Sequence, residues 1–148
     1  MDIGCGLAYV AEFFQKEFDS FLYLLDGDFE STRNKTRDIL YGPASDFKFY
    51  TPVANLRESF DLRNLRYDFI NAEFPSFKRK TDMDVIVSTA SCGFHYPVTT
   101  YKELIKSVSN EDTQIFMELR KGVPHEGIKI KNKIHEFSKS VPCELIIK

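Results

Sequence analysis

Two glycines near the start of the chain, and an aspartate twenty residues after the second, are the residues best suited to hold a ligand. The segment DIGCGLA (residues 2–8) lies between a short stretch of strand and a helix. Glycines there let the backbone turn tightly and approach a ligand without Cβ clashes. Asp26 ends the next apolar run, where doubly wound folds place an acidic residue that binds a ribose. Asp2, Gly4, Gly6 and Asp26 therefore predict a site for a ribose-containing ligand; a plain tight turn and an ordinary strand-end aspartate are the alternatives.

A second candidate is the loop of residues 89–97, which reads Thr-Ala-Ser-Cys-Gly-Phe-His-Tyr-Pro. It follows the clearest predicted strand, and ligands of open α/β sheets bind beyond the carboxyl ends of the strands. His95 carries the side chain that exchanges a proton most readily near neutral pH. The loop thus offers His95 as a general base, and a structural histidine bonded to a backbone carbonyl is the alternative.

The spacing of apolar residues predicts the elements that position these groups. Steps of three or four predict helices at 7–18, 53–60, 101–108 and 130–137. Thr51 before Pro52 is expected to open the second helix, and Thr100 with Glu103 to cap the third. Apolar runs predict strands at 21–25, 67–74, 84–88, 114–119 and 143–147. Residues 28–50 are polar and rich in turns, and we expect one short helix there, at 32–40.

The order of these elements predicts an α/β fold with a doubly wound, mostly parallel sheet and helices on both faces. One domain over residues 1–148 accommodates it. Only Met1 to Ile3 can form the first strand, so we expect it to be cut short. The apolar strand over 144–147 is expected to leave an uncovered edge. We therefore expect a homo-oligomer formed through the sheet margin, or else limited stability as a monomer.

Composition narrows the partners. Of the 148 residues, 43% are hydrophobic and 28% charged, as in globular proteins, and the net charge of −2 argues against nucleic-acid binding. A small-molecule substrate remains the expected partner. Three separated cysteines without CxxC spacing predict neither a disulfide framework nor a metal site. No apolar run reaches the roughly 18 residues of a membrane helix, and no signal peptide is evident, so we expect a cytoplasmic protein and no membrane partner.

Three segments resemble class I S-adenosylmethionine-dependent methyltransferases. DIGCGLA is similar to their first motif, LLDGD (24–28) to the end of their second strand, and INAEF (70–74) to their third-strand motif. The resemblance implies a Rossmann-like core that binds S-adenosylmethionine. The residues it assigns to the cofactor are Asp2, Gly4, Gly6, Asp26, Ala72, Glu73 and Ser88. The departure is Ala8, a small residue where many members have a third glycine.

The second half of the chain resembles a narrower group, bacterial sugar O-methyltransferases. The matching segments are DVIVSTASCGFHYPVTTYKELI (84–105) and QIFMELRKG (114–122), with Cys92 where the group has tryptophan. This implies methyl transfer to a small hydroxylated acceptor such as a sugar. His95 would be the base, and the pocket for the acceptor would be formed by Phe94, Tyr96 and Tyr101.

Two other functions stay open. One is a cofactor-binding protein without activity, either a partner subunit or a fragment. The other is a nicotinamide-dependent oxidoreductase. It is disfavoured because bulky Tyr9 occupies the position of the third glycine in Gly-x-Gly-x-x-Gly.

Overall fold

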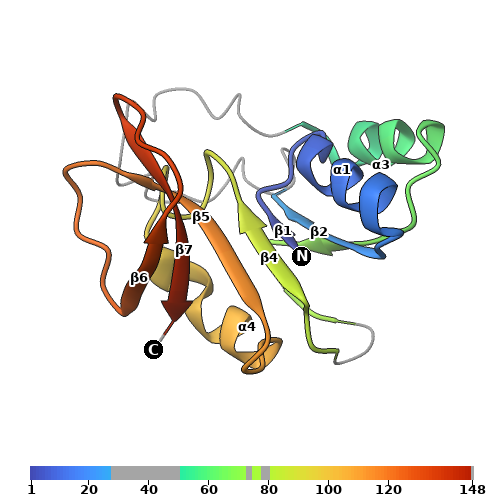
Figure 1. The fold of residues 1–148 in the computed structure, drawn as a ribbon. Helices are drawn as coiled ribbons and strands as arrows, with labels where there is room; N and C mark the ends of the chain where they lie inside the picture. Colours follow the sequence, from blue (N-terminus) through green and yellow to red (C-terminus); the bar gives the residue numbers. More distant parts are fainter. Residues whose placement is uncertain (28–50, 73–74, 78–80, 148) are drawn as a thin grey trace. The chain divides into compact units, whose positions relative to one another are not determined.

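The described part of the chain comprises residues 1–27, 51–72, 75–77 and 81–147 of a computed structural model (Figure 1). These residues form two compact units, one up to residue 77 and one from residue 81 onward. The short helix that the sequence predicts at 32–40 lies outside the described residues. Each unit is described below by itself.

The first unit is built on three parallel strands, β1 (Asp2–Ile3), β2 (Leu22–Asp26) and β3 (Tyr67–Asn71). β2 lies between the other two and is almost wholly buried, as an apolar strand covered on both faces must be. Parallel strands end at the same edge of a sheet. The turn that follows β1 and the aspartate that ends β2 are therefore neighbours.

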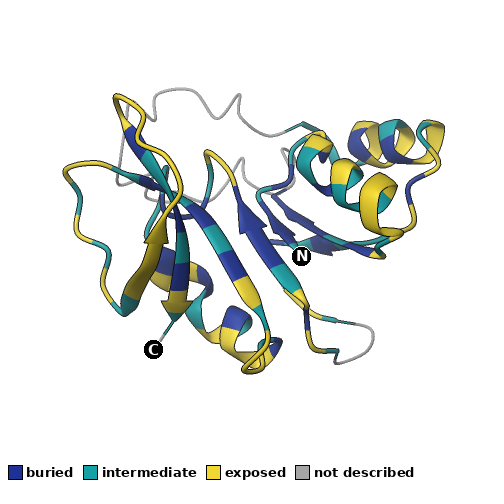
Figure 2. Cartoon of the chain, in the orientation of Figure 1, coloured by how far each residue is buried: buried dark blue, intermediate teal, exposed yellow. Residues whose placement is uncertain are grey.

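Two helices, α1 (Tyr9–Phe18) and α3 (Val53–Leu62), pack on these strands (Figure 1). Figure 2 shows both buried and exposed positions on the two helices. The buried ones are Ala11 of α1 and Leu56 and Phe60 of α3. α1 begins two residues later than predicted, because Ala8 has the left-handed φ of 56°, which a helix cannot contain. The shared core consists of Cys5, Ala8, Ala11, Leu22, Leu24, Leu56, Phe60 and Leu65.

The second unit has four strands in the order β4-β5-β7-β6. β4 (Val85–Ser88) and β5 (Gln114–Arg120) are parallel, whereas β7 (Ser140–Ile147) runs antiparallel to both β5 and β6 (Ile128–Lys133). The 3₁₀-helix η1 (Val98–Tyr101) and helix α4 (Lys102–Ser107) connect β4 to β5. The strands predicted at 21–25, 67–74, 84–88, 114–119 and 143–147 correspond to β2, β3, β4, β5 and β7, although residues 73–74 lie outside the described part.

The predicted helix at 130–137 is wrong, because Ile128–Lys133 is the strand β6. Its isoleucines alternate with lysines, and Ile128 and Ile130 pair with Ile147 and Leu145 of β7. Ile134 and Phe137, which completed the helical pattern, are exposed. The expectation that β7 is an uncovered edge is wrong for the same reason, since β7 lies between β5 and β6.

Both predicted helix caps are also wrong. α3 begins at Val53, with Pro52 at the N-cap and no side-chain capping bond, so Thr51 lies one residue too early. Thr100 lies within η1, and α4 begins at Lys102, again without a side-chain capping bond. The 3₁₀-helix takes the place of the first α-helical turn that the Thr100–Glu103 pair predicts.

Candidate functional site

The turn between β1 and α1 has an unusual backbone. Gly4, Gly6 and Ala8 all lie in the left-handed region, with φ of 70°, 48° and 56°. The amides of Gly4 and Cys5 both donate to the carbonyl oxygen of Leu25, at 2.7 and 3.1 Å. Glycine adopts this conformation freely, whereas Ala8 adopts it at a cost of roughly 1 kcal/mol. The left-handed φ at position 8 explains why a glycine suits the place where Ala8 departs from the resembled motif.

Asp26 holds this turn from the end of β2. Its Oδ2 accepts the amide N–H of Gly6 at 2.6 Å, and its Oδ1 accepts that of Gly27 at 2.7 Å. The side chain is buried, so both bonds are charge-assisted and shielded from water. The Cys5 thiol also approaches this carboxylate, with 3.9 Å between its Sγ and Oδ2. The aspartate and the glycine turn, which the sequence predicts as parts of one site, are in direct contact.

Asp2 is a buried carboxylate beside the same turn. Its Oδ1 has no hydrogen-bond partner among the described residues. Burial raises the pKa of Asp2 to about 7, and the charge of Asp26 adds to the rise. A buried polar atom without a partner is costly. This oxygen therefore marks a place where a ligand with a hydrogen-bond donor or a positive charge is favoured.

Ala72 is the fifth predicted cofactor residue in the first unit. It is buried directly after β3, and its amide donates to the backbone carbonyl oxygen of Asp26 at 2.8 Å. Asp2, Gly4, Gly6, Asp26 and Ala72 are thus brought together at the ends of three neighbouring strands. Glu73 lies outside the described residues.

In the second unit, the loop after β4 is closed by its own hydrogen bonds. The amides of Phe94 and His95 donate to the carbonyl oxygen of Ser91 at 3.0 and 2.8 Å. The Ser91 hydroxyl lies 2.7 Å from the Tyr96 hydroxyl, and the Gly93 amide donates to the Tyr96 carbonyl oxygen at 2.8 Å. These bonds fix the backbone that carries His95.

Gly93 is required where it stands. Its φ is 87°, and a Cβ added there would lie 2.8 Å from Cδ2 of Leu119. The carbonyl oxygen of Gly93 accepts the amide N–H of Arg120 at 3.0 Å. The loop therefore packs directly against the carboxyl end of β5.

His95 has an environment suited to a base. Its ring lies edge-on to Phe94, with 5.0 Å between centroids, and it is half-buried. Burial lowers the pKa of His95, the positive charge of Arg120 lowers it further, and Glu118 opposes them. The imidazole is therefore neutral at neutral pH and able to accept a proton.

Two residues that the sequence analysis did not select support this loop. Glu118 accepts the Ala90 amide N–H at 3.0 Å through Oε2 and the Ser140 hydroxyl through Oε1. The guanidinium carbon of Arg120 lies 5.3 Å from the centroid of the Phe94 ring. Both occupy alternate positions at the carboxyl end of β5. No motif in the sequence marks either residue, and their roles become visible only from the contacts between β5 and the loop.

The remaining predicted residues are placed differently from one another. Ser88 is buried at the end of β4, and its hydroxyl accepts the Cys92 amide N–H at 2.9 Å, which makes it a support of the loop. Tyr101 is buried in η1 with its ring 5.8 Å from that of Tyr96. Phe94 and Tyr96 are half-buried. The roles assigned to these side chains stay predictions.

Within the described ranges, no group of three or more His, Cys, Asp or Glu side chains could hold a metal ion. The helices described there include none that is long and apolar enough to span a membrane. Cys5, Cys92 and Cys143 are all buried as free thiols.

Similar solved structures share the fold. A ribosomal protein methylase from Lactobacillus delbrueckii subsp. bulgaricus has a TM-score of 0.56 at 15% identity, over 99% of this chain and 68% of that one. A SAM-dependent methyltransferase from Aquifex aeolicus has a TM-score of 0.58 at 10% identity, over 99% of this chain and 80% of that one. A protein from Pyrococcus horikoshii OT3 has a TM-score of 0.60 at 11% identity, over 99% of this chain and 80% of that one. The predicted doubly wound, mostly parallel α/β fold is thereby confirmed. No protein-family model matches the chain, and no curated protein shows significant sequence similarity to it.

Proposed function

We propose that this chain binds S-adenosylmethionine at the glycine turn and transfers its methyl group to a small hydroxylated acceptor such as a sugar. The observation that carries the proposal is the Asp26 carboxylate, bonded to the Gly6 amide at 2.6 Å at the ends of parallel strands. The fold is shared with a SAM-dependent methyltransferase from Aquifex aeolicus, which supports the proposal.

The charges around the turn favour this cofactor over a nicotinamide dinucleotide. Asp2 places a buried carboxyl group beside the turn, and S-adenosylmethionine carries an ammonium and a sulfonium group, both positive, against a single carboxylate. A dinucleotide would bring a negatively charged pyrophosphate to the same place. It would also require a small residue at position 9, where Tyr9 begins α1.

Each residue of the turn has a separate part in holding the cofactor. Asp26 accepts hydrogen bonds from the ribose hydroxyls, and Asp2 balances positive charge on the methionine part. Gly6 permits close approach, since a Cβ added there would meet no atom within 4 Å. Ala72, Glu73 and Ser88 are assigned to the same ligand by their resemblance to the family. When bound, S-adenosylmethionine supplies a methyl group already activated by its sulfonium centre.

We assign the acceptor to the loop after β4. A neutral hydroxyl is a poor nucleophile, and a positioned base contributes on the order of 10²–10⁴ to the rate of such reactions. His95 is the base in this proposal, because its lowered pKa keeps the imidazole unprotonated at neutral pH. Phe94 and Tyr96 contribute the aromatic surface against which the acceptor packs, and the buried ring of Tyr101 supports that of Tyr96 from 5.8 Å away.

Calorimetric titration with S-adenosylhomocysteine, S-adenosylmethionine and NAD tests the proposal. We expect the first two to bind and to raise the melting temperature, because a ligand that selects the folded state stabilises it. We expect NAD not to bind. A folded protein whose melting temperature is unchanged at saturating S-adenosylhomocysteine would overturn the cofactor assignment. Cofactor binding without transfer to any hydroxylated acceptor would favour the non-catalytic alternative.

A further inference from the structure

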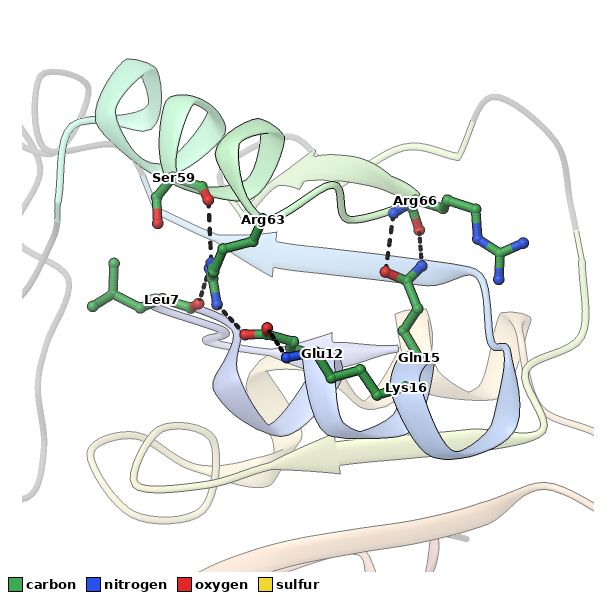
Figure 3. Close-up of polar contacts among 7 residues, drawn as sticks. All are labelled: Leu7, Glu12, Gln15, Lys16, Ser59, Arg63 and Arg66. Atoms are coloured by element: carbon green, nitrogen blue, oxygen red, sulfur yellow. Dashed lines mark hydrogen bonds and ion pairs between the residues drawn. The ribbon is translucent and has the colours of Figure 1, made fainter.

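Arg63, the residue directly after α3, reaches across to the cofactor turn (Figure 3). Its guanidinium group donates to three acceptors in three different parts of the first unit. Nη1 pairs with the Glu12 carboxylate of α1 at 2.5 Å, and Nη2 donates to the backbone carbonyl oxygen of Leu7. Nε donates to the carbonyl oxygen of Ser59 in its own helix at 3.1 Å. One side chain thus ties α3 to α1 and to the turn.

The guanidinium is also held between aromatic rings. Its carbon lies 5.1 Å from the centroid of Tyr9 and 5.6 Å from that of the buried Phe60. Only 21% of the side chain is exposed. Three directed hydrogen bonds and the cation–π contacts hold this planar group in one orientation. Its bond to the Leu7 carbonyl oxygen therefore costs little additional side-chain entropy. Arg63 is therefore a rigid support.

The hydrogen bond from Arg63 to Leu7 lies in the part of the turn where the backbone conformation is least restricted. Leu7 lies between Gly6 and Ala8, both of which have left-handed backbones. On one side, the Gly6 amide is held by Asp26 at 2.6 Å. On the other, the Leu7 carbonyl is held by Arg63. Glycine-containing turns have many accessible conformations, so a fixed geometry requires bonds from outside the turn.

We propose that Arg63 is a positioning residue for the cofactor turn, which fixes the Leu7 peptide and thereby sets the affinity for the cofactor without touching it. This inference rests on the proposed binding of S-adenosylmethionine at the turn. It assigns a binding role to a residue 56 positions away from Leu7 in the sequence.

Arg66 provides a matched control on the same side of the unit. It pairs with Asp19, the residue after α1, and its backbone exchanges hydrogen bonds with Gln15 (Figure 3). Arg66 therefore also ties α1 to the chain that follows α3, but at the end of α1 remote from the turn. Loss of its side chain removes an ion pair and leaves the Leu7 bond intact.

Three variants separate the turn bond from general stability. Arg63→Lys keeps a positive charge near Glu12, but it has one nitrogen in place of Nη1 and Nη2, which reach Glu12 and Leu7 separately in the planar fork. Glu12→Gln removes the ion pair and keeps the Leu7 bond. Arg66→Gln removes the control ion pair. Two quantities are measured for each, the hydrogen-exchange rates of the Gly6 and Ala8 amides in the ligand-free protein and the Kd for S-adenosylhomocysteine.

We expect Arg63→Lys to speed exchange of both turn amides and to raise the Kd, each about tenfold, as the loss of one charge-assisted hydrogen bond gives. Glu12→Gln and Arg66→Gln should change both quantities less than about twofold, even where they lower the melting temperature, because neither removes a bond to the turn. Arg63→Gln, measured in the same way, is the second variant should the lysine variant not fold.

Two results would overturn the inference. One is wild-type exchange and Kd in Arg63→Lys, which would show that the Leu7 bond does not control the turn. The other is an equal rise of the Kd in all three variants, which would mean that general stability sets the affinity. If the wild-type protein binds no S-adenosylhomocysteine, the proposed function fails, and the role in affinity fails with it. The exchange rates then still decide whether Arg63 holds the turn.

Discussion

Replacement of Asp26 by asparagine tests the contact on which the proposed site depends. The two carboxylate oxygens of Asp26 each accept a backbone amide, that of Gly6 at 2.6 Å and that of Gly27 at 2.7 Å. Asparagine has the same shape but only one acceptor oxygen. Whichever way its side-chain amide turns, its NH₂ group faces one of the two backbone N–H donors. One charge-assisted bond is lost, and one amide is left without an acceptor.

The structure sets the size of the effect. A hydrogen bond to a charged group contributes about 1.5–3 kcal/mol, and leaving the buried amide unsatisfied adds to that loss. We expect Asp26→Asn to lower the free energy of unfolding by about 3 kcal/mol. For a domain of this size that corresponds to a fall in Tm of roughly 6–12 °C. The affinity for S-adenosylhomocysteine should fall about 30-fold, since the ribose loses about 2 kcal/mol of bonding.

Urea unfolding and calorimetric titration measure the two effects separately, at a temperature where the variant is folded. Asp84→Asn is the control, because Asp84 is an exposed aspartate beside a strand, and its replacement should change stability by less than about 0.5 kcal/mol. Wild-type stability in Asp26→Asn would refute the reasoning about the turn. Lowered stability with unchanged affinity would show that another residue holds the ribose.

Three further predictions concern the remaining groups of the two candidate regions. Gly6→Ala should cost about 1 kcal/mol of stability because the φ of residue 6 is 48°. Calorimetry should show a larger loss of S-adenosylhomocysteine affinity, since the new methyl group points into open space that the ligand would occupy. Burial raises the pKa of Asp2 to about 7, so wild-type stability should fall as pH rises from about 4 through 7. Above pH 7, Asp2→Asn should then be more stable than the wild type in urea unfolding, by at most about 4 kcal/mol. A stability difference between the two proteins that is equal at pH 4 and pH 8 would contradict this. His95→Ala should lower the rate of methyl transfer roughly 100-fold with little change in cofactor affinity. Because the pKa of His95 lies below its usual 6.5, the wild-type rate should decline only below that pH. NMR titration of the Arg120→Gln variant should show a higher pKa for His95.

The glycine turn and its aspartate could be predicted because their signals are local. The left-handed backbone at Gly4 and Gly6 favours glycine whatever the rest of the chain does. Asp26 ends an apolar run, and two parallel strands necessarily end at the same sheet edge. Sequence and simple geometry were therefore sufficient to bring Gly6 and Asp26 together.

Arg63 and Glu118 could not be found in that way. Arg63 contacts Glu12 across 51 residues, and Glu118 contacts Ala90 across 28. Each owes its role to the way whole elements pack, and an arginine after a helix or a glutamate in a strand is unremarkable by itself. Residues that support a site from a distance are therefore missed when only strand ends and motifs are inspected.

The strand β6 shows how two periodicities can compete in one segment. Ile130, Ile134 and Phe137 repeat at steps of four and three, as on a helix face, whereas Ile128 to Lys131 alternate as in a strand. Pairing with β7 decides the competition, because it places Ile128 and Ile130 opposite Ile147 and Leu145. The gain from that pairing depends on a strand that comes later in the chain.

The lysines of β6 also remove the reason to expect association through β7. That expectation assumed that the apolar residues of β7 end the sheet, yet β6 covers them and is the last strand of its group in the described part of the chain. β6 carries Lys129, Lys131 and Lys133, all exposed, and Lys131 pairs with Glu144 of β7 at 2.6 Å. Charged side chains on an outer strand, lysine above all, oppose pairing with another chain because the incoming strand would have to desolvate them. The lysines that interrupt the apolar pattern of β6 thus also protect this strand from aggregation.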